Sequence, residues 1–123
     1  MPHMLVEYSD NLEFDIQTLF ARLADAMLAT KVVRVKGFRF RAMAYSDYLV
    51  ADGKANNAFV HLGLRIREGR PQERKEALAQ ACLSVLEEFF AQDIAAQRIA
   101  LSVDIQELYN GTSLNSNHIP SNE

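Results

Sequence analysis

Four segments of the chain alternate between apolar and polar side chains with a period of two, the pattern of half-buried β-strands. They span residues 3–8, 36–45, 59–66 and 99–106. The third segment has one apolar face made of alternate residues, Val60, Leu62, Leu64 and Ile66. In the second, the pattern puts Phe38, Phe40, Ala42 and Ala44 on one face. We therefore expect four strands, each with one face toward a core.

Two other segments place apolar residues at the three- and four-residue spacing of an amphipathic helix. The first stripe is Ile16, Leu19, Phe20, Leu23 and Met27. The second stripe is Leu78, Ala81, Cys82, Val85, Leu86 and Phe89. Asp15 stands where a helix N-terminus favours negative charge. Pro71 suits the first turn of the second helix, because the N–H that proline lacks would have no intrahelical partner there.

The order strand–helix–strand therefore occurs twice, in residues 1–46 and 57–108, with the turn signal Asp52-Gly53 between the two units. Each helix is long enough to cross over between two parallel strands. We predict one domain over residues 1–108, in which both helices cover one face of a four-stranded sheet. Residues 109–123 lose periodicity and are predicted to form a polar C-terminal tail or arm.

The second face of such a sheet has no helix to cover it. It would carry Phe59, His61 and Ala100 among polar residues, which is too mixed for a core and too apolar for exposure. A homo-oligomer in which these faces meet would bury them.

The composition of the chain excludes several classes of protein. Its 123 residues suit a single domain. The formal net charge of −3, from 13 Lys+Arg against 16 Asp+Glu, argues against general nucleic-acid binding. No apolar run approaches the roughly 20 residues of a membrane span, and the N-terminus has no signal-peptide pattern. The single Cys rules out an intrachain disulfide and fits a reducing compartment. We expect a cytoplasmic protein.

The cations are clustered, although the total charge is acidic. One cluster lies in a stretch without acidic residues and contains Lys31, Arg34, Lys36, Arg39 and Arg41. The other contains Arg65, Arg67, Arg70, Arg74 and Lys75. The guanidinium fork matches carboxylate and phosphate groups, so the clusters favour an anionic small molecule, with solvated faces or ion pairs as the alternative. Position singles out Arg39, within a predicted strand, and Arg70, beside a helix N-terminus where anions bind well.

Pro2 is the second candidate for chemistry. Initiator methionine is usually removed before a small residue, and we expect the loss of Met1 to leave a secondary amine at the first strand. Burial and neighbouring arginines both lower the pKa of an amine. An amine that is uncharged at neutral pH can shuttle a proton.

Five stretches of the chain are similar to sequences of one known family and occur in the same order with similar spacing. They are PHMLVEYSDN, GFRFR, ADG, AFVH and GR. From Pro2 to about Leu108 the chain resembles the 5-carboxymethyl-2-hydroxymuconate Δ-isomerase family of the tautomerase superfamily. The resemblance implies an α+β, tautomerase-like fold, with two βαβ units in one four-stranded mixed sheet. It also implies a homotrimer whose sheets surround a channel and whose active sites lie near subunit boundaries.

The resemblance further implies that Pro2 is the catalytic base and that Arg39 and Arg70 are the active-site arginines. The implied reaction moves a proton across a conjugated dienol tricarboxylate to give an enone, without a cofactor. The arginines would hold substrate carboxylates and stabilise the dienolate.

Four further residues are candidates for substrate binding. Arg41 belongs to a cationic cluster, and His3 follows the catalytic proline. Phe38 and Phe59 are candidates for an apolar pocket wall, with core packing as the alternative. The three histidines are too scattered for metal-ligand spacing, so no metal is expected.

Three functions are therefore compatible with the sequence. The first is a cofactor-free isomerase of aromatic-acid catabolism that acts on a hydroxymuconate. The second is another tautomerase activity, such as keto–enol tautomerisation of a phenylpyruvate-like acid. The third is a trimeric module that binds a small anion without catalysis.

Overall fold

Four strands form one mixed sheet in the computed structural model, which describes residues 2–120. The strands are β1 (His3–Ser9), β2 (Arg39–Tyr45), β3 (Ala58–Arg67) and β4 (Ile99–Leu108), in the order β2-β1-β3-β4. β1 pairs in parallel with β2, and β3 with β4, whereas β1 and β3 are antiparallel. The predicted pair of βαβ units in a four-stranded mixed sheet is confirmed. Met1 and residues 121–123, the end of the predicted tail, lie outside the described residues.

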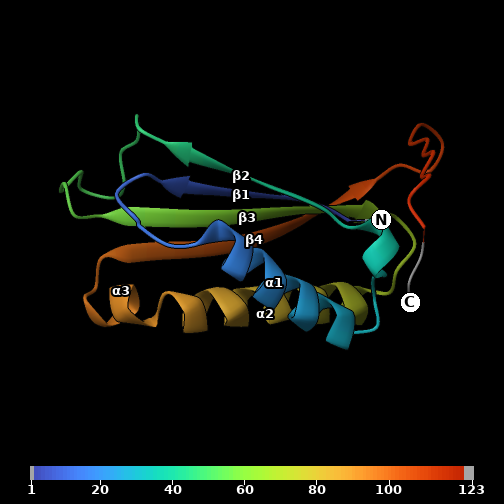
Figure 1. Cartoon of the computed structure of the whole chain (residues 1–123), viewed down its shortest axis with the longest axis horizontal. Helices are drawn as coiled ribbons and strands as arrows, with labels where there is room; N and C mark the ends of the chain where they lie inside the picture. The colour runs from blue at the N-terminus through green and yellow to red at the C-terminus, as the bar shows by residue number, and fades with distance from the viewer. Residues whose placement is uncertain (1, 121–123) are drawn as a thin grey trace.

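The two long helices, α1 (Ile16–Ala29) and α2 (Gln72–Phe89), lie side by side on one face of the sheet (Figure 1). Asp15 caps α1, because its carboxylate accepts hydrogen bonds from Gln17 N at 3.1 Å and Thr18 Oγ1 at 2.7 Å. These bonds, with that from Thr18 the stronger influence, lower the pKa of Asp15. Pro71 directly precedes the first residue of α2. A short helix that the sequence pattern did not predict, α3 (Ala91–Ala95), follows α2. Within residues 2–120, no helix is both long and apolar enough to cross a membrane.

The core lies between the sheet and these two helices. Along β3 the residues alternate strictly, with Val60, Leu62, Leu64 and Ile66 fully buried. The helices contribute Leu19, Leu23, Met27, Leu78, Cys82, Val85 and Leu86. Burial of each large apolar side chain contributes about 1.5–3 kcal/mol to the free energy of unfolding. The helices therefore stay on this face of the sheet, and the opposite face is left open for function.

β2 differs from its prediction in where it begins and in the burial of its second half, although it ends at Tyr45 as predicted. It begins at Arg39 instead of residue 36, because a 3-10 turn (η1, Val35–Gly37) precedes it. This turn is closed by hydrogen bonds from Gly37 N to Arg34 O and from Phe38 N to Val35 O. In its second half, Ala42 and Ala44 are exposed, since this edge strand meets the core only through Phe40. The predicted apolar face of β2 is therefore wrong beyond Phe40.

The strand directions bring four chain segments to one end of the sheet. His3 pairs with Arg39 at the start of β2 and with Arg65 near the end of β3, and Arg67 pairs with Leu108 at the end of β4. We call this the Pro2 end of the sheet. The start of β1 and the segment after β4 lie together there (Figure 1).

Candidate active site

Pro2 lies immediately before β1, and its side chain is fully buried. Its carbonyl oxygen accepts a hydrogen bond from Arg39 N at 3.1 Å. This bond extends the parallel pairing of β1 and β2 by one step. The sheet register therefore places the predicted proton-transfer residue next to the first predicted arginine.

The guanidinium group of Arg39 donates hydrogen bonds to two different segments. Nη1 donates to the carbonyl of Gly37 at 3.0 Å, and Nη2 donates to Oδ1 of Asn115 at 3.3 Å. The first partner belongs to the 3-10 turn and the second to the tail. The tail thus contacts a residue that the sequence places in the active site.

Arg70 follows the sharp turn at which the chain leaves β3. Gly69 makes this turn with φ of +113°, a conformation that L side chains rarely adopt. Arg70 then donates from Nε to Val32 O at 3.3 Å and from Nη1 to Arg67 O at 3.1 Å. These two bonds orient its guanidinium group toward the turn that leads into β2.

A cavity of about 440 Å³ at this end, which we call the basic pocket, has Arg70 in its wall. The other residues that line it are Val32, Arg34, Lys36, Gly37, Asn115 and Asn117. Arg39 adjoins the pocket through its bonds to Gly37 and Asn115. Positive charge is therefore concentrated around a space large enough for a small polycarboxylate.

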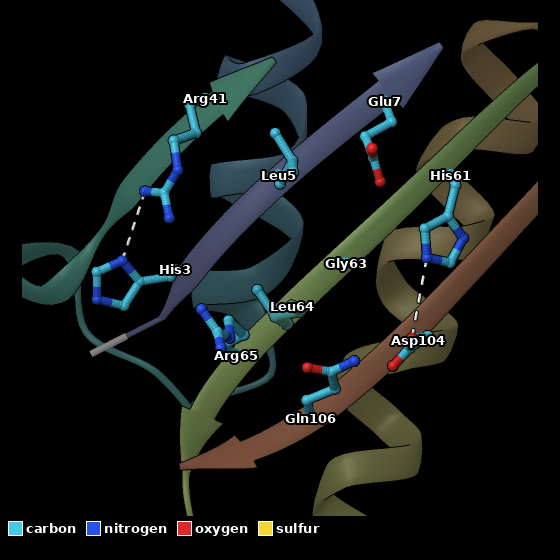
Figure 2. A pocket seen from close by; sticks show the side chains of 10 residues that line it. All are labelled: His3, Leu5, Glu7, Arg41, His61, Gly63, Leu64, Arg65, Asp104 and Gln106. Atoms are coloured by element: carbon cyan, nitrogen blue, oxygen red, sulfur yellow. Dashed lines mark hydrogen bonds and ion pairs between the residues drawn. The ribbon is translucent and has the colours of Figure 1, made fainter. Parts of the chain in front are cut away.

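His3 and Arg41 face a different cavity, of about 240 Å³, on the open face of the sheet (Figure 2). Arg41 Nη1 lies 3.5 Å from His3 Nδ1. Partial burial lowers the pKa of His3, and the charges of Arg41, Arg39 and Arg65 lower it further. Burial and the surrounding arginine charges therefore both favour the uncharged form of His3.

The other side of this open-face cavity contains polar pairs that the sequence pattern did not single out. His61 contacts Ser102 Oγ at 2.7 Å through Nδ1, and its Nε2 lies 3.9 Å from Asp104. The hydroxyl of Tyr45 donates to Glu7, and this bond raises the pKa of Tyr45. Each pair joins different strands, so only the sheet register could have revealed it.

The two predicted phenylalanines lie outside both cavities. Phe38 stacks on Phe40 with ring centroids 4.8 Å apart and packs against the core. Phe59 lies 6.3 Å from the rings of both Tyr45 and Tyr48, at the opposite end of the sheet from Pro2. Within one chain, Arg39 contacts Pro2 through the main chain and adjoins the pocket lined by Arg70, whereas Phe59 lies apart from all three.

Comparison with known proteins identifies the family. The sequence model of the 5-carboxymethyl-2-hydroxymuconate isomerase family matches residues 2–122. The chain belongs to this family. A 5-carboxymethyl-2-hydroxymuconate Delta-isomerase from Escherichia coli is 31% identical over 121 residues, covering 97% of this chain and 96% of the relative.

Solved structures agree with the 5-carboxymethyl-2-hydroxymuconate isomerase assignment. A 5-carboxymethyl-2-hydroxymuconate isomerase from Deinococcus radiodurans R1 superposes with a TM-score of 0.89 at 36% identity, covering 95% of this chain and 90% of that one. The fused 4-OT wild-type symmetric trimer, at 16% identity, matches the fold with a TM-score of 0.72 over 97% of this chain and 94% of its own. The protein is an isomerase with a tautomerase-like fold.

Proposed function

We propose that this isomerase converts a 2-hydroxymuconate-type dienol tricarboxylate into its conjugated enone without a cofactor, with Pro2 as the general acid–base. Family membership supports the reaction class. The observation that supports the mechanism is a chain of contacts: Arg39 bonds to Pro2 through its main chain, and its side chain bonds to Gly37 and Asn115, which line the basic pocket with Arg70. The proposed setting is the cytoplasmic breakdown of aromatic acids, and the single buried cysteine fits a reducing compartment.

Proton transfer requires the free amine of Pro2. An amide nitrogen has no basic lone pair, so removal of Met1 creates the base. Burial of Pro2 and the arginine charges around it disfavour the ammonium form and lower the pKa of the amine. The amine takes the proton of the 2-hydroxyl group, whose C–O bond becomes the carbonyl. The protonated amine then forms the new C–H bond at the far carbon of the conjugated system.

Arg39 and Arg70 supply the electrostatic part of the mechanism. Both guanidinium groups are already oriented by main-chain carbonyls, Arg39 by Gly37 and Arg70 by Val32 and Arg67. Groups that are fixed in this way bind carboxylates and stabilise the dienolate with little reorganisation. Arg34 and Lys36 add positive charge to the same pocket.

His3 and Arg41 are proposed substrate contacts on the open-face side of Pro2. Arg41 provides charge, and uncharged His3 provides a neutral polar group between Arg41 and Pro2. A homotrimer would cover the open face, on which Met43 is 51% exposed. In such a trimer Phe59 would reach a site only on a neighbouring subunit, as an apolar wall.

The decisive test compares processed protein, shown by mass spectrometry to begin at Pro2, with its Pro2→Ala variant. Loss of a dienol tricarboxylate is followed by ultraviolet absorbance. We expect kcat/KM to fall about 10²- to 10⁴-fold in the variant, the usual contribution of a positioned acid–base group. Protein that retains Met1 is the matched control and should be inactive. Undiminished turnover by Pro2→Ala contradicts the mechanism.

A panel of acids tests the substrate class. A dienol tricarboxylate uses both arginines, whereas a phenylpyruvate-like acid has one carboxylate and does not require both. Preference for the one-carboxylate acid would instead support keto–enol tautomerisation. Binding of these acids without turnover would support an anion-binding module.

A further inference from the structure

The C-terminal tail returns to the Pro2 end of the sheet and forms part of the basic pocket. Asn117 Nδ2 donates to the carbonyl of Lys36 at 2.8 Å, while its Oδ1 accepts from Ile119 N at 3.0 Å. Asn115, two residues earlier, accepts from Arg39 Nη2. Both asparagines line the pocket that contains Arg70. The tail is therefore attached at the 3-10 turn and reaches the guanidinium of Arg39.

The chemistry of an asparagine side chain suits this place. Its amide has an oxygen that accepts and an NH₂ group with two donors. The oxygen of Asn115 accepts a hydrogen bond from Arg39, and Asn115 lines the basic pocket. Its NH₂ group is therefore the part of the side chain that can donate to an anion. An amide can orient Arg39 without neutralising it, whereas an aspartate in the same place would pair with the guanidinium and repel an anion.

We propose that Asn115 is a positioning and specificity-determining residue of the basic pocket. It orients Arg39 through Oδ1 and donates from Nδ2 to a carboxylate of the substrate. Asn117 holds the segment that carries it against Lys36. This inference rests on the proposed function and adds to it a tail residue that favours substrates with several carboxylates.

The experiment uses the full processed chain with Asn115→Ala, Asn115→Asp and Asn115→Gln. Three quantities are measured for each variant: KM and kcat for the dienol tricarboxylate, and Kd for unreactive propane-1,2,3-tricarboxylate by calorimetry. We expect Asn115→Ala to raise KM and Kd about tenfold, the effect of a lost hydrogen bond to a charged group, with a smaller change in kcat. Asn115→Asp should raise both further, and Asn115→Gln should restore part of the loss.

Asn110→Ala is the matched control, because Asn110 lies in the same tail but its Oδ1 accepts from Arg67 at 3.4 Å. It should leave KM and Kd at the parent values. Values of Kd and KM in Asn115→Ala and Asn115→Asp that equal those of the parent overturn the inference. If the parent binds the tricarboxylate but turns over no dienol, the proposed function fails, while the change in Kd still decides the role of Asn115.

Discussion

The carbonyl oxygen of Pro2 accepts a hydrogen bond from the backbone N–H of Arg39 at 3.1 Å. The bond is made by the main chain, so it persists when the arginine side chain is changed. The two functions at this position can therefore be separated: the backbone of residue 39 places Pro2, and its side chain supplies charge.

This separation predicts the effect of Arg39→Ala. We expect kcat/KM to fall about 10²- to 10³-fold, as for the loss of a group that stabilises a developing anion. The melting temperature should change little, because the bond to Pro2 remains. Arg39→Lys should recover only part of the activity, since an ammonium lacks the planar fork of arginine.

Arg22→Ala is the matched control for this variant. Arg22 is 43% exposed on α1 and pairs with Glu88 at 3.0 Å, on the opposite side of the sheet from the open-face cavity. It should retain full kcat/KM. A large loss of melting temperature in Arg39→Ala would contradict the separation of the two roles.

His3 gives a pH dependence whose sign follows from its surroundings. Partial burial, and then Arg41, Arg39 and Arg65, lower its pKa from the usual 6.5, so the unfolded chain binds this proton more readily than the folded one. The contribution of uncharged His3 to the free energy of unfolding is therefore fully present above pH 6.5. It is lost as the pH falls from 6.5 through the lower pKa that His3 has in the folded protein.

NMR titration of the His3 ring measures this directly. We expect a pKa below 6.5 in the parent. In Arg41→Ala the pKa should rise but stay below 6.5, because burial is the largest cause. Lys31→Ala, which changes an exposed cation elsewhere, is the control and should leave the titration unchanged. An unshifted His3 titration in the parent would contradict the arrangement in Figure 2.

Cys82 is predicted to be chemically inert. It is fully buried in the core, and burial raises the pKa of its thiol to about 12. At pH 8 about one molecule in 10⁴ would carry the reactive thiolate. Iodoacetamide should therefore modify Cys82 only after the protein is unfolded in denaturant, which mass spectrometry can follow. Rapid modification of the native protein would show that α2 opens or that the thiol is activated.

The sequence pattern was sufficient where one face of an element meets the core. The alternation of Val60, Leu62 and Leu64 and the stripe through Leu19 and Leu23 both appear in the structure with the predicted side buried. The pattern failed in the second half of β2, where Ala42 and Ala44 share the face of Phe40 but are exposed. Alternation predicts a strand; it does not show that a helix reaches that strand.

The candidate site was predictable in part for a related reason. Pro2, Arg39 and Arg70 stand beside recognisable features, the chain start, a strand and a strand-to-helix turn. Asn115 and Asn117 had no such signal, because a polar tail has no periodicity. Their place follows from the direction of β4, which ends opposite Arg67 at the Pro2 end of the sheet.

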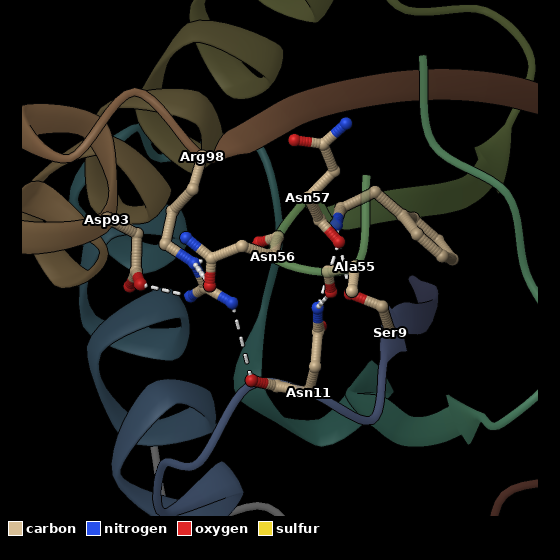
Figure 3. A network of polar contacts seen from close by, with 8 residues as sticks. Ser9, Asn11, Ala55, Asn56, Asn57, Asp93 and Arg98 are labelled. Atoms are coloured by element: carbon tan, nitrogen blue, oxygen red, sulfur yellow. Dashed lines mark hydrogen bonds and ion pairs between the residues drawn. The ribbon is translucent and has the colours of Figure 1, made fainter. Parts of the chain in front are cut away.

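Arg98, at the far end of the sheet, is predicted to contribute to stability without affecting activity. There Arg98 contacts three segments (Figure 3), donating from Nη1 to Asp93 at 2.6 Å, from Nε to the carbonyl of Asn56 at 3.0 Å and from Nη2 to the carbonyl of Asn11 at 3.5 Å. Asn11, from the loop after β1, donates to the carbonyl of Asn57 at 2.8 Å. The side chains of Arg98 and Asp93 are only 15% and 26% exposed, so their interaction is poorly screened by water.

Arg98→Ala should therefore lower the free energy of unfolding by about 1–3 kcal/mol, because it leaves Asp93 half-buried without its partner. Chemical denaturation measures this change, and kcat/KM should stay at the parent value, since Arg98 precedes β4 at the end opposite Pro2. Lys54→Ala is the matched control: Lys54 pairs with Asp52 at 3.7 Å, and both side chains are more than half exposed. Such a pair contributes little, so its loss should not be measurable. Equal stability of the two variants would show that the network around Arg98 acts only as a solvated surface pair.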